Sequence, residues 1–180
     1  MIYFITSNTH KYREVQDMTS RSIIQNPLEY PEIQADSLEA VAQYGIQYCY
    51  KKVQAPCFIE DSGLFIHTLG GFPGPYSRYV FETLGCTGIL RLLSESHDRS
   101  AHFQSVIAYT DGSDTKLFMG RIDGMISLRE KGEKGFGFDP IFIPVGEKKT
   151  FAIMSLQEKN LYSHRGKAFK QFIIHLKKVK

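Results

Sequence analysis

Two consecutive acids follow an apolar run in the segment CFIEDSG, residues 57–63. An ionised carboxylate in apolar surroundings is costly unless a cation, a helix N-terminus or water compensates it. Strand ends in α/β folds open onto clefts, and a magnesium ion takes one or two carboxylates while water and phosphate oxygens fill its other positions. We therefore expect a strand that ends at Glu60 and Asp61, with Asp61 as a candidate metal ligand. The alternative is that residues 60–63 form an ordinary turn.

The segment SNTHK is a second candidate. It places the hydroxyl of Ser7, the amide of Asn8 and the ammonium of Lys11 after an expected short strand at residues 2–6. A polar helix is expected from about residue 10 to 18. Where a strand leads into a helix, backbone N–H groups and the helix dipole point at an anion. The segment lacks the glycines of a Walker loop, so a plain helix cap followed by a surface lysine remains an equal alternative.

Two further segments carry groups that suit a nucleotide. GFGFDP at residues 135–140 alternates glycine with phenylalanine, which lets the backbone approach a flat ligand while a ring stacks on it. The alternative is a set of core aromatics in a tight loop. SHRG at residues 163–166 opens a basic helix with His164 and Arg165 in its first turn, where a cation opposes the helix dipole and a function is favoured. Acids for a metal, cations for phosphates and a ring for a base together describe a nucleoside triphosphate site.

The elements that must position these groups alternate along the chain. We expect strands at 22–28, 57–59 and 63–69, and helices at about 37–52, 77–84, 87–94 and from 163 onward. Residues 102–110, 116–122 and 125–129 alternate with period two and are separated by DG turns at 111–112 and 123–124, which predicts an antiparallel meander. SLQE at 155–158 is a capping box. The pattern predicts a mixed α/β fold with a long central mixed sheet, and one two-lobed domain over residues 1–180 with the active-site cleft between the lobes.

Composition excludes several classes of protein. The chain has 180 residues, of which 42% are hydrophobic and 23% charged, so one domain with a substantial core is expected. Three cysteines without CxxC spacing indicate neither disulfides nor a zinc site. The absence of a basic leader and of a long apolar run favours a cytoplasmic protein without a membrane partner. The net charge of +3 is too mild to indicate nucleic acid, and the terminal Lys177, Lys178 and Lys180 suit the negative end of a helix dipole.

Five blocks in order along the chain resemble the inosine triphosphate pyrophosphatase family, which hydrolyses non-standard purine triphosphates to the monophosphate and pyrophosphate. The likeness covers nearly the whole chain, and YPEIQADSLE and EDSGLFI look most like archaeal members. The blocks are TSNTHK at 6–11, EDSGLFI at 60–66, GGFPGPYS at 70–77, KGFGFDPIF at 134–142 and EKNLYSHRGKA at 158–168.

The resemblance implies a role for each matching residue. Asp61 is the expected catalytic residue, which orients or deprotonates the attacking water, and Glu32 and Asp61 are the expected ligands of Mg²⁺. Glu60 is a less suitable base because alternate strand residues face opposite sides. The expected substrate contacts are Thr6, Ser7, Asn8, Lys11, Ser62, Phe136, Gly137, Phe138, Asp139, Lys159, His164 and Arg165. Many relatives carry a lysine near the position of Tyr44 or Gly45, so one phosphate contact is missing or moved.

Selectivity for the base is assigned to a few groups. We expect Arg165 to donate to the 6-oxo group of hypoxanthine or xanthine and to reject the 6-amino group of adenine, while Phe136 or Phe138 stacks on the ring. Discrimination against GTP must then come from the 2-position of the purine. We also expect Glu32 and Asp61 to lie close together and to face Lys11 and Arg165 across one cleft.

The resulting hypothesis is a Mg²⁺-dependent pyrophosphatase of ITP, dITP and XTP, with a small-molecule substrate and no nucleic-acid partner. The alternatives are a non-hydrolytic nucleotide sensor, an RNA-binding module that uses the basic C-terminal helix, and an enzyme of the same fold that removes the terminal phosphate. The family is usually dimeric. The segment with Tyr76, Tyr79, Val80 and Phe81 is equally suited to a homodimer interface and to the core.

Overall fold

The computed structural model describes residues 1–178, and Lys180 lies outside the described residues. The strands and helices are numbered in the order of the chain. The strands are β1 (Ile2–Ile5), β2 (Ile23–Asn26), β3 (Cys57–Ile66), β4 (Ser100–Thr110), β5 (Thr115–Ile126) and β6 (Phe142–Pro144). The α-helices are α1 (Thr9–Asp17), α2 (Leu38–Val53), α3 (Ser77–Leu92), α4 (Leu156–Tyr162) and α5 (His164–Lys178), and the short 3₁₀ helices are η1 (His67–Leu69) and η2 (Gly74–Tyr76).

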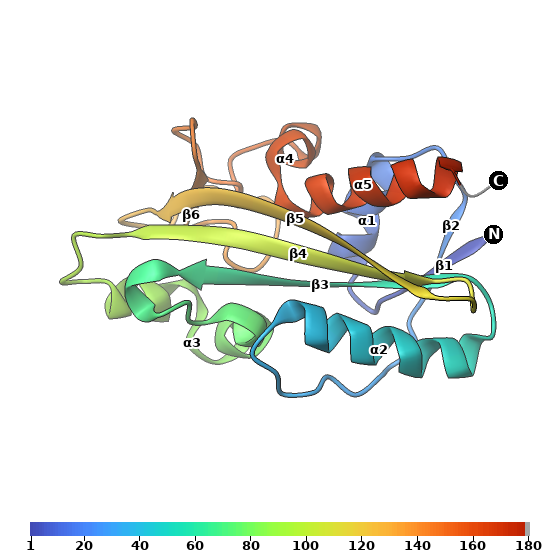
Figure 1. Cartoon of the computed structure of the whole chain (residues 1–180). Helices are drawn as coiled ribbons and strands as arrows, with labels where there is room; N and C mark the ends of the chain where they lie inside the picture. The colour runs from blue at the N-terminus through green and yellow to red at the C-terminus, as the bar shows by residue number, and fades with distance from the viewer. Residues whose placement is uncertain (179–180) are drawn as a thin grey trace.

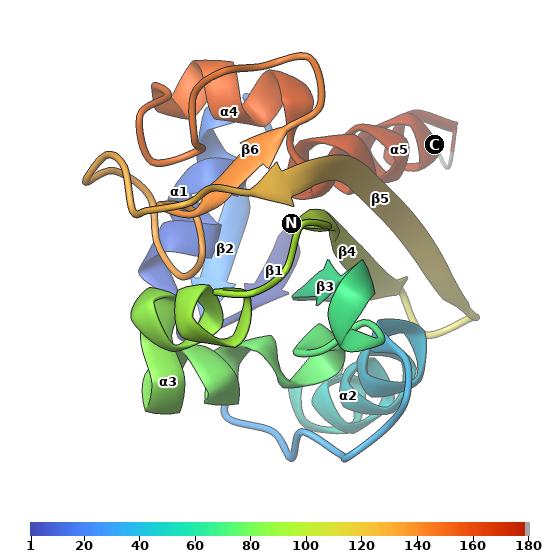
Figure 2. The ribbon, with the colours of Figure 1, turned by 90° about the vertical axis from the view of Figure 1, so that its left-hand side faces the viewer.

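One mixed sheet runs through the described part of the molecule in the order β2-β1-β3-β4-β5-β6. β1 is parallel to both of its neighbours, and the other pairs are antiparallel. Figure 1 shows α2 and α3 on one side of the long strands and α5 with α4 on the other. In Figure 2, which looks along these strands, α4 and α5 lie above the sheet and α2 below it. The predicted mixed α/β fold with a long central sheet is confirmed.

The strand that carries the acids does not end at them. β3 continues through Glu60 and Asp61 to Ile66, and it pairs with β4 in unbroken register from Cys57↔Thr110 to Ile66↔Ala101. The expected division into two strands is therefore wrong. β1 pairs with β3 only up to Phe58. Beyond this point β1 no longer covers that edge of β3.

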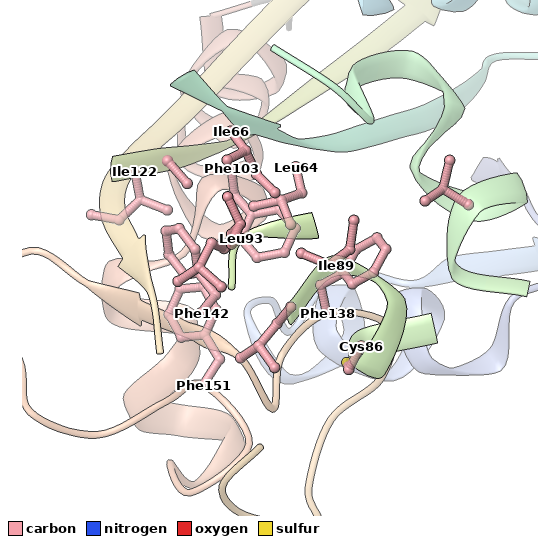
Figure 3. Packing of buried hydrophobic residues seen from close by; sticks show 14 of the residues in the cluster. Leu64, Ile66, Cys86, Ile89, Leu93, Phe103, Ile122, Phe138, Phe142 and Phe151 are labelled. Carbon is pink, nitrogen blue, oxygen red and sulfur yellow. The ribbon is translucent and has the colours of Figure 1, made fainter. Parts of the chain in front are cut away.

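Three groups of buried apolar side chains hold the layers together. One group joins α2 to the sheet through Ile46 and Ile59, and a second joins α5 to the opposite face through Phe58 and Phe172. The third lies toward the other end of the long strands, where α3 and the segment around β6 pack on the sheet (Figure 3). Its aromatic members include Phe103, Phe138, Phe142 and Phe151.

Local sequence signals are confirmed at several element ends. Ser155 and Glu158 form the capping box of α4, with both reciprocal hydrogen bonds present. Ser163 Oγ accepts from the N–H of Gly166 at 3.0 Å at the start of α5. α3 is broken at Gly85, whose φ of 62° and ψ of −170° are not helical, in agreement with the two separate helices expected there.

One expectation, for residues 123–124, is corrected. The second DG turn is absent, because β5 runs straight through Asp123 and Gly124. A side chain at Gly124 would collide with the carbonyl of Ile143 on β6, so the glycine permits close strand pairing and does not make a turn. The segment that was equally suited to a homodimer interface and to the core contains residues of both kinds. Val80 is buried in the core, whereas Tyr79 is 68% exposed.

Cys49, Cys57 and Cys86 are free and buried. Among residues 1–178, no helix has the length and apolar character that a membrane crossing requires.

The close approach of α5 to β5 generates a stability prediction. A Cβ added to Gly120 would overlap the carbonyl of His164 and the N–H of Ala168, so Gly120→Ala forces α5 away from the sheet. We expect a loss of about 1–3 kcal/mol in the free energy of unfolding, as for other overpacked positions. Thermal or urea unfolding measures it. Leu117→Ala, at an exposed position of the same strand, serves as control, and equal stability of the two variants would contradict the packing argument.

Candidate active site

The N-terminal loop forms a structured cap that leads into α1. Asn8 Oδ1 accepts from the N–H groups of His10 at 2.9 Å and Lys11 at 3.1 Å, and Thr6 Oγ1 accepts from the N–H of Asn8 at 3.1 Å. Asn8 is therefore the helix cap that the sequence allowed. Lys11 is not a free surface lysine, because its ammonium lies 2.9 Å from Glu60 Oε2 and 3.0 Å from the Glu60 carbonyl oxygen. The loop is thereby held against the uncovered edge of β3.

A buried chain of alternating charges lies on the α5 face of β3. Lys159 Nζ donates to Glu14 at 2.7 Å and to Asp139 at 2.6 Å. The other oxygen of Glu14 accepts from Arg165, and the guanidinium also lies 3.1 Å from Glu60. With Lys11 at its end, the chain contains three acids and three cations. We call it the ion network; its members are Lys11, Glu14, Glu60, Asp139, Lys159 and Arg165.

Burial makes each member of the ion network depend on its neighbours. Burial opposes the charged form of Glu60, but Arg165 and Lys11 hold the pKa of this carboxyl well below its usual range. Arg165 and Lys159 lower the pKa of Glu14 in the same way. Burial raises the pKa of Asp139, against the opposing charge of Lys159. The side chain of Arg165 is 1% exposed, so its charge is stable only because two carboxylates share it.

The start of α5 also supplies polar atoms that have no partner. His164 stacks on Phe103 with ring centroids 4.6 Å apart, and burial together with the charge of Arg165 keeps the pKa of the imidazole well below its usual value. The histidine is therefore neutral, and only Arg165 brings a cation to this first turn. Within residues 1–178, His164 Nδ1 and Arg165 Nε are buried without a hydrogen-bond partner. Buried polar atoms of this kind are suited to a polar ligand or water.

Phe136 covers the two central cations. Lys159 Nζ lies 4.9 Å and Arg165 Cζ 5.4 Å from the centroid of its ring, and His10 stacks on the ring at 5.3 Å. Asp139 fixes the loop by accepting from the N–H of Phe136 at 2.9 Å. Phe138, in contrast, is buried in the core edge-on to Phe81, so it is not available for stacking on a base.

Two cavities of about 250 Å³ lie in the described part of the chain. One is at the turn after β4, beside Tyr50 and Gly112, and holds no group of the ion network. The other adjoins Glu14, Gly135 and Lys159. We regard the second as part of the candidate site because charged groups and the aromatic loop meet there.

A second group of charges lies on the opposite face of β3. Burial raises the pKa of Asp61 to about 6, and the charges of Glu60 and Glu32 add to this effect while Lys11 opposes it. Glu32 is exposed and lies 3.7 Å from Arg78. Glu32 and Asp61 remain the pair of acids that the resemblance implied. No set of three or more His, Cys, Asp or Glu side chains among residues 1–178 is arranged to hold a metal.

Ser62 joins the two faces. Its hydroxyl accepts from Arg165 Nη2 at 3.0 Å, and its backbone N–H donates to Asp61 Oδ1 at 2.9 Å. The expected arrangement places Glu32 and Asp61 opposite Lys11 and Arg165 across one cleft. In the structure Glu60 pairs with Lys11 and Arg165, and Asp61 points to the opposite face of β3, because side chains alternate along the strand.

α2 packs closely on the sheet at Gly45, next to Tyr44, where the resemblance implied a missing or moved phosphate contact. Gly45 on α2 faces the sheet, and a Cβ there would lie 2.7 Å from Ile59 and 2.8 Å from the ring of Tyr30. Tyr30 thus fills the space beside Ile59, two residues before Asp61 on the same face of β3. Tyr44 is 43% exposed.

One important residue was not foreseen. Glu14 bridges Lys159 and Arg165, but in the sequence it is one polar residue in a polar helix. No local signal marks it, because its partners are 145 and 151 residues away.

Comparisons with known proteins identify the family and support the fold. A model of the Ham1 family matches residues 2–175. A relative from Pyrococcus horikoshii, named dITP/XTP pyrophosphatase, is 53% identical and covers 98% of this chain and 96% of its own. One from Thermococcus kodakarensis with the same name is 50% identical over 97% of this chain and 96% of its own. The structure of the Staphylococcus aureus Ham1 protein aligns with a TM-score of 0.86 at 28% identity and covers 99% of both chains.

The ion network generates a prediction for Glu14. Glu14→Ala leaves the buried Lys159 and Arg165 without a shared partner, and loss of one member of a buried ion pair typically costs about 3–5 kcal/mol. Glu14→Gln retains the shape and should cost less. Urea unfolding at pH 7 measures both, with Glu29→Gln at an exposed position as control. If Glu14→Ala is as stable as the control, the network does not hold the fold together.

The same network predicts an acid transition. The pKa values of Glu14 and Glu60 are lower in the folded protein than the usual value of 4.5, so their stabilisation is complete above pH 4.5 and is lost as the pH falls below it. We expect the melting temperature of the wild type to fall steeply below pH 4.5. The fall should be shallower for Glu14→Gln, which lacks one of these carboxyls. Parallel curves for the two proteins would contradict the assignment.

Proposed function

The chain belongs to the Ham1 family, and from this premise we propose that it acts on the nucleotide pool as a dITP/XTP pyrophosphatase. It hydrolyses non-standard purine nucleoside triphosphates and is a hydrolase of phosphoric anhydrides. The products of this reaction are the nucleoside monophosphate and pyrophosphate.

The observation that supports the proposal most strongly is the ion network beneath Phe136. A purine triphosphate carries close to four negative charges and a flat aromatic base. Lys11 stands beside Glu60 at the uncovered edge of β3, and its side chain is 17% exposed, so a phosphate can reach its ammonium. Phe136 stands over Lys159 and Arg165, and a base that displaces His10 from this ring can stack on it.

We propose Mg²⁺ as the cofactor, held by Glu32 and Asp61. The donor set fits this ion, because it needs only one or two carboxylates and fills its other positions with water and phosphate oxygens. The raised pKa of Asp61 also fits, since carboxyls crowded by Glu60 and Glu32 gain from a nearby cation. When bound, the ion would neutralise charge that develops on the phosphates.

Several residues of this chain each have one role in the proposed reaction. Water attacks the α-phosphorus, a new P–O bond forms, and the bond to the bridging oxygen breaks so that pyrophosphate leaves with the electron pair. Asp61 accepts the proton of the water through a carboxylate oxygen. Its orientation is fixed by the N–H of Ser62. Lys11 stabilises the growing negative charge. Glu60 cannot take the proton, because its carboxylate is held by Lys11, Ser105 and Arg165.

Recognition of the base is assigned to Arg165. A guanidinium has five N–H donors, and Glu14, Glu60 and Ser62 do not use the one on Nε. We propose that this side of Arg165 donates to a 6-oxo group. Adenine presents a donor there and would leave a buried polar group unpaired. Because Arg165 is also structural, its replacement by alanine would disturb the whole network.

The RNA-binding alternative has little support. Two of the cations that suggested it, Lys159 and Arg165, are buried and neutralised by carboxylates, so they are not available to a nucleic-acid backbone.

We further propose a cytoplasmic homodimer. The three free cysteines suit a reducing compartment. Tyr76 and Tyr79 are exposed at the start of α3 and would supply aromatic contacts to a second copy. Sedimentation of the wild type and of Tyr79→Ser tests this proposal: a monomeric wild type would contradict it.

A substrate panel with product identification tests the function directly. We expect ITP, dITP and XTP to be cleaved to the monophosphate and pyrophosphate, and ATP and GTP to be poor substrates. Chromatography of the nucleotide together with separate assays for pyrophosphate and orthophosphate distinguishes the outcomes. Diphosphate and orthophosphate as products would instead indicate removal of the terminal phosphate, and tight binding of ITP without turnover would indicate a sensor.

Asp61→Asn separates chemistry from folding. The raised pKa means that the charged carboxylate destabilises the folded protein above about pH 6, an effect that disappears as the pH falls below this value. Without added metal, the variant should therefore melt at a higher temperature than the wild type at pH 8, and the difference should shrink at pH 5. Its turnover of ITP should fall by a factor of at least about 100. Retained turnover would remove Asp61 from the catalytic role.

A further inference from the structure

Two histidines face each other at the far end of β3, outside the candidate active site. His67 begins η1, directly after the end of β3, and His102 lies on β4. His67 Nε2 and His102 Nδ1 are 3.0 Å apart. Between two neutral imidazoles this contact is a single hydrogen bond, in which one nitrogen donates and the other accepts.

Neighbouring groups fix the orientation of both rings. Ser100 Oγ lies 3.0 Å from His67 Nδ1, and when this nitrogen carries the proton, Nε2 is left as a bare lone pair. Ser100 is itself held by Asp98, which accepts from its N–H at 2.8 Å. The ring of His102 stacks on Phe65 at 4.8 Å with an interplanar angle of 2°. The pair is thus preorganised by packing and by hydrogen bonds.

We propose that His67 Nε2 and His102 Nδ1 bind a divalent transition-metal ion such as Zn²⁺ or Ni²⁺. Nitrogen ligands lie about 2.0–2.1 Å from zinc, so two of them at 90–109° about the ion are roughly 2.9–3.4 Å apart. The observed separation of 3.0 Å falls in this range, and small rotations of the side chains would turn both lone pairs toward the ion. Imidazole favours zinc, nickel and copper, whereas magnesium prefers oxygen ligands. The site therefore differs in chemistry from the carboxylates at Glu32 and Asp61.

One cation and two acids lie near the pair. Asp123 on β5 is the cross-strand partner of His102, and it lies 2.6 Å from Arg121. Asp98 approaches from the side of His67. Burial and the charge of Arg121 lower the pKa of His102 to about 4.

The consequence of binding is structural. Two protein ligands leave water in the remaining positions, so the ion binds less tightly than in a closed site with four protein ligands. It joins the start of η1 to β4, across 35 residues of sequence. Phe65 lies between His102 and the glycine loop that leads to α3, because side chains at Gly71 and Gly74 would touch its ring. The bound ion therefore stabilises the region where the chain turns toward Arg78 and the active-site acids.

Isothermal titration with ZnCl₂ and NiCl₂ tests the proposal on the full chain without a histidine tag. We expect one ion per chain, a higher melting temperature with Zn²⁺ than without, and no binding of Mg²⁺ at this pair. His67→Gln and His102→Gln should each weaken Zn²⁺ binding by a factor of at least ten and remove the shift in melting temperature. His175→Gln, at a histidine on α5, is the matched control and should bind as the wild type does.

Two measurements keep the outcome clear. Melting curves without metal show whether each variant is folded, and titration of Asp61→Asn shows whether Zn²⁺ binds at the acidic site instead. Binding that survives in both histidine variants, or that is lost in Asp61→Asn, contradicts the proposal. So does a wild type that binds neither Zn²⁺ nor Ni²⁺. ITP turnover by the histidine variants should match the wild type, so these results do not depend on the proposed pyrophosphatase activity.

Discussion

The sharing of buried charge between Arg165 and Glu14 is the interaction on which the site depends. A guanidinium that is 1% exposed would be unstable in this position without carboxylates on both sides. Glu14 and Glu60 supply them, and through Lys159 and Lys11 the same pairing extends to Asp139 and to the N-terminal loop. Elements from both ends of the chain are thereby fixed to β3, and the groups that would bind a nucleotide are rigid before any ligand arrives.

The architecture explains how charges on two faces of one sheet can serve one reaction. β1 stops pairing with β3 at Phe58. Side chains on both faces of the sheet can therefore approach the next residues of β3 around its free edge. Glu60 completes the ion network on one face of β3, while burial and the charges of Glu60 and Glu32 raise the pKa of Asp61 on the other. In the proposed reaction these adjacent acids take different roles, one structural and one chemical. The alternation of side chains along the strand is the physical cause.

Several features of the fold and of the candidate site could be predicted from short-range sequence patterns, whereas features that depend on distant residues could not. The capping box at Ser155, the Asn8 cap and the helix break at Gly85 follow from local rules, and the structure bears them out. The continuous passage of β3 through two acids was missed, because only distant partners make these carboxylates tolerable there. Glu14 was missed for the same reason, and Gly124 was read as a turn although it accommodates β6. Phe136 and Phe138 look alike in sequence, yet only Phe136 lies over the cations.

Hydrolysis of ITP in water enriched in ¹⁸O is the most direct test of the central claim, that Asp61 directs water to the α-phosphorus while the ion network holds the base. Mass spectrometry of the two products locates the new oxygen. The account predicts one ¹⁸O atom per turnover in the nucleoside monophosphate and none in pyrophosphate. Label in pyrophosphate would place the attack on the β-phosphorus and would contradict it.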